Sequence, residues 1–191
     1  MDRRELLKMI VAATGAAMVG LPALVQGKAL AAGVMPAFSD ADIALLDEIA
    51  ETILPRTKTP GAKDAGAGRF MATFVTDCYT ARQQATFRAG LADIDARSGA
   101  RFASLTPDAR TTLLRTLDAE AKARTAEVTE TGTPEEGEAM PHYFTMLKQL
   151  AIFGFFTSKV GATEVLHYVA VPGRYDGDLA YVAGTPAWGT S

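Results

Sequence analysis

The chain has 191 residues, of which 48% are hydrophobic and 21% charged, and its formal net charge is −3. This is an ordinary globular composition and it excludes bulk disorder. An acidic balance repels phosphate backbones, so we expect no nucleic-acid partner. The single cysteine, Cys78, excludes an internal disulfide, a multi-thiolate zinc or iron–sulfur site, and a C-x-x-C-H haem attachment.

Residues 1–31 have the features of a twin-arginine export signal. A basic head precedes a weakly hydrophobic stretch, residues 9–25, which is short for a membrane span, and an A-x-A cleavage site follows. The signal residues are Arg3, Arg4, Lys8, Ala29 and Ala31. Cleavage after Ala31 reduces the 19 basic and 22 acidic residues to 15 and 20, a net charge of −5. The alternative is an anchoring helix that stays in the mature protein.

This signal predicts that the mature protein works in the periplasm, with membrane contact only indirect or through an uncleaved leader. The twin-arginine route carries folded proteins, which suggests that the chain, or something bound to it, folds around a cofactor before export. The rest of the sequence contains no cofactor motif. We therefore expect no cofactor in this chain.

The region after residue 31 starts with a tether, residues 32–38, and a first helix from Ser39 to Pro55. Ser39 is a suitable N-cap, and apolar residues recur at helical spacing up to Ile53. The carboxylates Asp47, Glu48 and Glu51 are expected to face solvent. Pro55 ends the helix.

Further helices are expected at residues 68–79, 81–97 and 106–126, after a loop rich in Pro, Gly and Lys at 55–68. The sequence Thr106-Pro107 is a strong start, because an N-cap residue precedes a proline at the first helical position. A polar link, residues 127–139, leads to the most apolar helix, residues 141–159, which is apolar on more than one face and is therefore central or covered by a partner. A short helix, residues 162–168, follows.

The fold class predicted is all-α: one compact helical domain, residues 32–191, of about five to six helices. Its last part, residues 168–191, contains no clear helix and forms a long irregular C-terminal arm. Tyrosine and tryptophan are enriched at protein interfaces, so we expect this arm to bind a partner, although it could also pack on its own domain. The predicted interface residues are Phe155, Phe156, Tyr168, Tyr175, Tyr181 and Trp188.

Three other features suggest chemistry but have simpler interpretations. The glycines between Gly61 and Gly68 follow a helix rather than a strand, so they predict a tight turn and not a dinucleotide site, although their backbone N–H groups could meet a partner. His142 and His167 lack the spaced carboxylates that would complete a metal or acid–base site, and His142 could cap the helix that it precedes or face solvent. No serine has the context of a hydrolase nucleophile.

Cys78 falls on the apolar face of its helix, beside Met71, Phe74 and Val75. We therefore expect a buried thiol that packs as a small hydrophobe. Pairing with another chain is the alternative, because an odd cysteine in an oxidising compartment can form an intermolecular disulfide.

Several stretches resemble the gluconate 2-dehydrogenase subunit 3 family. The most specific are L-L-D-E-I-A-E-T-I-L-P at residues 45–55 and T-P-G-A-K-D-A-G at 59–66; residues 144–158 and 171–175 also match. The resemblance implies a noncatalytic small subunit. A large flavoprotein similar to glucose–methanol–choline oxidoreductases would hold FAD and oxidise a sugar, polyol or glycoside, and a cytochrome c could accept the electrons.

The resemblance also implies that the small subunit binds the flavoprotein and carries it through the twin-arginine route, which would explain an export signal on a cofactor-free chain. It gives no catalytic, cofactor-binding or metal-binding residues to this chain. The alternatives are a stand-alone periplasmic helical binding or structural protein, and an independent enzyme that uses His142 or His167.

Overall fold

The computed structural model describes residues 37–130, 140–171, 173, 177–178, 180 and 182–189. The chain divides into two units, Met1–Met35 and Pro36–Ser191. The predicted leader, with Arg3, Arg4, Lys8, Ala29 and Ala31, lies outside the described residues, as does the part of the predicted link at 131–139.

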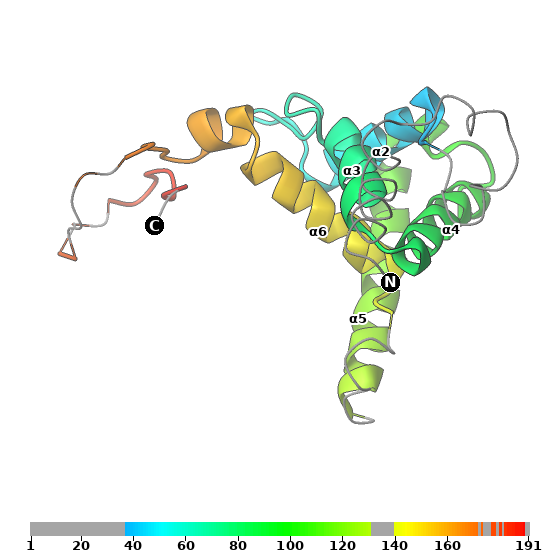
Figure 1. Ribbon diagram of the computed structural model, residues 1–191. Coiled ribbons are helices and arrows are strands. Elements are labelled where there is room, and N and C mark those ends of the chain that lie inside the picture. Colours follow the sequence, from blue (N-terminus) through cyan, green and yellow to red (C-terminus); the bar gives the residue numbers. More distant parts are fainter. Residues whose placement is uncertain are drawn as a thin grey trace, which may run out of the picture. The chain divides into compact units, whose positions relative to one another are not determined.

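Over the described residues the second unit is helical, which confirms the predicted all-α class (Figure 1). Those residues contain no strand, only a single isolated bridge between His167 and Trp188. The helices are α2 (Asp40–Ile53), α3 (Ala67–Cys78), α4 (Ala81–Arg97), η1 (Phe102–Ser104), α5 (Pro107–Glu130), α6 (Tyr143–Phe156) and η2 (Gly161–Val165). The short helix expected at 162–168 is this π-type turn η2, and α5 runs four residues further than expected.

Helices α2, α4 and α5 each start at a capping residue that the sequence supplies, whereas α3 starts after Gly66 without a side-chain cap. Ser39 before α2 and Thr80 before α4 form capping boxes with Asp42 and Gln83, in which side chain and backbone exchange hydrogen bonds. The Thr106 hydroxyl accepts a hydrogen bond from the backbone N–H of Ala109, 3.3 Å away, at the start of α5. These caps satisfy N–H groups that have no partner within the helix.

Helix α6 is the centre of the fold. It packs against α2, α3, α4 and α5, and Figure 1 shows it running across the other helices toward η2. Seven of its residues are buried: Phe144, Met146, Leu147, Leu150, Ala151, Gly154 and Phe155. The first five of them belong to the single hydrophobic core. The prediction that this helix is central is therefore confirmed, and it also has an exposed side.

A polar network joins α4, α5 and α6 at the start of α6. The Tyr143 hydroxyl donates a hydrogen bond to Asp93, which also forms an ion pair with Arg97 (2.8 Å), and Arg97 reaches Glu120 at 2.7 Å. Burial and the Asp93 carboxylate raise the pKa of Tyr143. A Cβ at Gly90 would lie 2.4 Å from the Tyr143 ring, so the ring fits only because residue 90 is glycine.

Candidate partner-binding surface

The glycine-rich loop at residues 55–66 is bound to carboxylates on α2. The two oxygens of Glu51 accept hydrogen bonds from the backbone N–H groups of Arg56 and Lys63, each at 2.8 Å. Asp47 accepts one from the backbone N–H of Gly68, also at 2.8 Å, and so holds the start of α3. These carboxylates are half-buried and accept hydrogen bonds from the backbone, so the expectation that they face solvent is wrong.

The close approach explains the glycine at position 61. A Cβ there would lie 2.4 and 2.5 Å from the Glu51 oxygens, and 2.6 Å from the backbone nitrogen of Arg56. The Gly61 N–H itself donates to Asp64 at 2.8 Å. The loop can therefore wrap around the Glu51 carboxylate only with no side chain at this position.

Glu48 joins this loop to the start of α5. It forms ion pairs with Lys63 and with Arg110, and the Arg110 contact is 2.5 Å. Burial raises the pKa of the Glu48 carboxyl, but hydrogen bonds and charge from Lys63 and Arg110 outweigh that effect and hold the pKa below its usual value. One carboxylate thus connects three segments that are distant in the sequence.

The glycine loop therefore does not offer a cradle for a phosphate or for a partner. Its N–H groups at residues 61–64 and 66–68 donate to carboxylates or carbonyls of the same chain. A phosphate site needs such donors pointing at the ligand. The expectation that these groups could meet a partner is wrong, whereas the prediction of a tight turn into the next helix is confirmed.

The exposed large apolar side chains that the structure describes all come after residue 151. They are Ile152, Phe153, Phe156, Tyr168, Val171, Val182 and Trp188. At residues 37–126 and 140–151, every large apolar side chain is buried or half-buried. Contiguous exposed apolar surface marks interaction sites in soluble proteins, so this uneven distribution points to the C-terminal part of the chain.

Three of these residues, Ile152, Phe153 and Phe156, lie in the last two turns of α6 and are called here the α6 patch. Phe153 is the most exposed of them, at 48%. Its ring is nevertheless held by two rings of α3, with centroids 5.6 Å from Phe70 and 5.9 Å from Phe74. Edge-to-face contacts of this kind fix the ring orientation.

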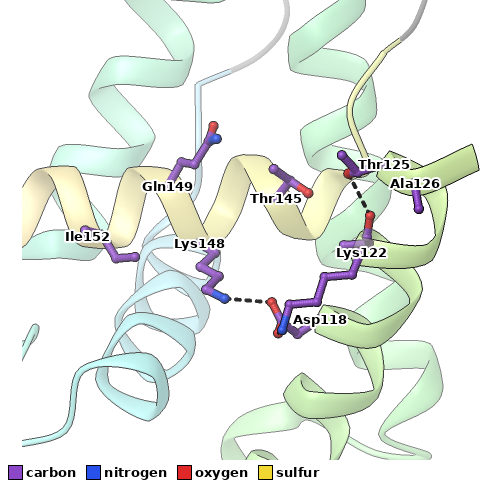
Figure 2. Close-up of a pocket in the computed structure, with 9 residues that line it drawn as sticks. Asp118, Lys122, Thr125, Ala126, Thr145, Lys148, Gln149 and Ile152 are labelled. Carbon is purple, nitrogen blue, oxygen red and sulfur yellow. Dashed lines mark hydrogen bonds and ion pairs between the residues drawn. The ribbon is translucent and has the colours of Figure 1, made fainter. Parts of the chain in front are cut away.

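The side of α6 that faces solvent also borders an open groove between α5 and α6, with a volume of about 660 Å³. Figure 2 shows Lys148 reaching from α6 to Asp118 of α5, a distance of 2.7 Å, with Ile152 further along α6. Hydrogen bonds from Lys122 and Lys148 lower the pKa of Asp118. The charged side chains of the groove are thus paired with one another. The end of the groove at Ile152 adjoins the α6 patch, to which Ile152 belongs.

The C-terminal arm is closed on itself near its base. His167 donates its backbone N–H to Ala187 at 2.8 Å, and its carbonyl accepts from Gly189 at 2.9 Å. The His167 and Trp188 rings lie 4.0 Å apart between centroids. Leu166 packs against Gly189, because a Cβ added at position 189 would lie 3.3 Å from the Leu166 side chain. The arm is a loop with both ends together, and Trp188 remains half exposed.

The predicted interface residues have different surroundings. Phe156, Tyr168 and Trp188 are exposed, but Phe155 is only 4% exposed and belongs to the inner side of α6. Tyr175 and Tyr181 lie outside the described residues. Ile152 and Phe153 are also exposed, although the sequence does not single them out, and the interface assignment as a whole stays a prediction.

The two histidines are placed as structural groups. His142 caps α6, because its Nδ1 accepts a hydrogen bond from the backbone N–H of Phe144 at 3.2 Å, and its ring stacks on Tyr143. Burial lowers the pKa of His142. His167 directly precedes the arm and lies against Trp188. Over the described ranges no group of three or more His, Cys, Asp or Glu side chains is placed to hold a metal ion.

Cys78 is exposed, so the expected buried thiol is wrong. It is the last residue of α3, beyond the turn at which Val75 still lies in the core. The apolar period of the helix continues to residue 78, but the neighbouring helices do not cover that turn.

A model of the family described as gluconate 2-dehydrogenase subunit 3 matches residues 40–173. The chain belongs to this family. The match spans α2 to η2, including the loop bound by α2 and the α6 patch. Because this family is a subunit of a dehydrogenase complex, its membership implies a dehydrogenase partner.

A search of curated proteins found no match, and neither did a search of solved structures. None of the helices in the described part of this subunit 3 family member is long and apolar enough to cross a membrane.

Proposed function

We propose that the chain is the noncatalytic small subunit of a periplasmic, FAD-dependent dehydrogenase complex that oxidises a sugar, polyol or glycoside. It binds the flavoprotein subunit and escorts it through the twin-arginine route. The observation that carries the proposal is the family match over residues 40–173. The exposed apolar side chains after residue 151 support it, because a subunit of a complex needs a surface for its partner.

The stand-alone alternative is less well supported. A helical protein that works alone would have an evenly polar surface and an arm packed on its own helices. The described parts of the arm instead leave Val171, Val182 and Trp188 exposed. A cytochrome c as electron acceptor remains a further part of the proposal, and selectivity for one substrate would reside in the flavoprotein.

The test is co-expression with a candidate flavoprotein dehydrogenase from the same organism, with the affinity tag on the flavoprotein. We expect the chain to co-purify with flavin absorbance, and dye-reducing activity to appear in the periplasmic fraction. Arg3→Lys combined with Arg4→Lys should leave that activity in the cytoplasm. Export of active flavoprotein in the absence of the chain would contradict the escort role, and failure of the two proteins to co-purify would contradict the subunit role.

A further inference from the structure

We infer that the α6 patch is the contact through which the chain binds its dehydrogenase partner, and that this contact is apolar rather than ionic. The inference rests on the proposed function, since it names the surface that a small subunit would use. It differs from the interface expected from the sequence, which included Phe155 and omitted Ile152 and Phe153.

The most exposed ring of the α6 patch, that of Phe153, is held in place by its neighbours. Phe153 is anchored by Phe70 and Phe74, whose own rings lie 5.7 Å apart. Phe70 can approach α6 because residue 154 is glycine: a Cβ there would lie 2.5 Å from the Phe70 ring. A half-exposed ring that is already ordered loses little freedom on binding, which is the property of an interface hot spot.

The α6 patch and the chain that follows it carry few charged residues. Residues 152–191 hold only two basic and three acidic residues. The next charged side chain before the patch, Lys148, is already paired with Asp118 at 2.7 Å, and the side chains after it are Thr157 and Ser158. Lys159 is the first charged residue after the patch, and the patch itself contains no charged side chain, so ion pairs are not the main basis of recognition at this surface. The matching surface on the partner must be apolar.

The area of the α6 patch indicates which kind of molecule covers it. Its three side chains expose on the order of 250 Å² per copy, whereas a stable interface takes roughly 800 Å² from each partner. A second copy docked on this patch alone would fall short of that area. A larger partner can also cover the exposed residues of the arm, which begins about a dozen residues after Phe156. The dehydrogenase subunit that the family membership implies is such a partner.

The experiment compares binding of full-length variants to the purified flavoprotein dehydrogenase with which the unmodified chain co-purifies. We expect Phe153→Asp and Ile152→Asp each to weaken binding at least about tenfold. The matched control is Ala89→Asp, which places the same charge on an exposed position of α4 and should change binding less than about twofold. Raising NaCl from 0.1 to 1 M should change the affinity of the unmodified chain by less than about threefold.

Ile152→Asp keeps the test valid if Phe153→Asp disturbs the aromatic cluster, and thermal melting of each variant checks folding. If the unmodified chain binds and both variants bind equally well, the patch assignment is wrong while the proposed function stands. If the unmodified chain does not bind, the proposed function itself fails. A steep loss of affinity with salt would overturn the apolar contact. A homodimer that Phe153→Asp dissociates, with flavoprotein binding unchanged, would assign the patch to self-association instead.

Discussion

Replacement of Glu51 by alanine tests whether the glycine loop is held by the carboxylates of α2. The substitution removes the acceptors of two backbone N–H groups, those of Arg56 and Lys63, each 2.8 Å from a carboxylate oxygen. A hydrogen bond to a charged group contributes about 1.5–3 kcal/mol. Both donors belong to exposed residues, so water recovers part of the loss, and we expect a total destabilisation of about 3 kcal/mol.

For a domain of this size that corresponds to a melting temperature lower by about 6–12 °C. Thermal and urea denaturation followed by circular dichroism would measure it. Glu51→Gln keeps one acceptor oxygen and should cost about half as much. Asp77→Ala removes an exposed carboxylate from α3 and should stay within about 0.5 kcal/mol. If Glu51→Ala also stayed within that limit, the loop would not depend on the carboxylate, and the role assigned to α2 would be refuted.

Three further predictions concern single sites. Because burial lowers the pKa of His142, the unfolded state binds more protons, and the free energy of unfolding should fall as the pH drops through about 6.5. His142→Asn should keep the cap to Phe144 and abolish this dependence between pH 8 and pH 5. If the variant had the same pH profile as the unmodified chain, the dependence would not come from His142. Gly154→Ala should destabilise the chain by about 1–3 kcal/mol in urea denaturation, since the Phe70 ring must move, and a neutral effect would show that the ring is not confined. Cys78 should react with a thiol reagent in the native state at close to the rate of a free thiol, and protection until unfolding would show that it is buried.

The helix positions were largely predictable because their signals are local. Ser39 and Thr106 act as caps next to the residues that they cap, and α4 has the predicted bounds, Ala81–Arg97. A local hydrogen bond between a side chain and the backbone depends on few residues, so the sequence contains most of the information. The predicted end of α5, at residue 126, is four residues short of Glu130, because the last turns of this helix are polar and give no apolar periodicity, although Gly132 and Pro134 follow it closely.

The surface was harder to predict, since it depends on which helices meet. Every side of α6 is apolar near its C-terminus, so the periodicity does not tell that Phe155 is inside and Phe153 outside. Cys78 continues the apolar stripe of α3, but α3 ends there and no neighbour covers it. The carboxylates of α2 have the spacing of a solvated face, and only the return of the loop at residues 55–66 gives them backbone partners.

The closure of the arm at His167 and Trp188 determines where the described chain ends in space. Gly189 lies against Leu166, which is bonded back to Gly161 and so to the end of α6. A fluorophore attached shortly after Gly189 would therefore be joined to the chain beside the base of the arm, and not at the far end of a long extension. Energy transfer from such a label would report on events near η2, and a bulky tag at that position would compete for the space that the partner is proposed to occupy.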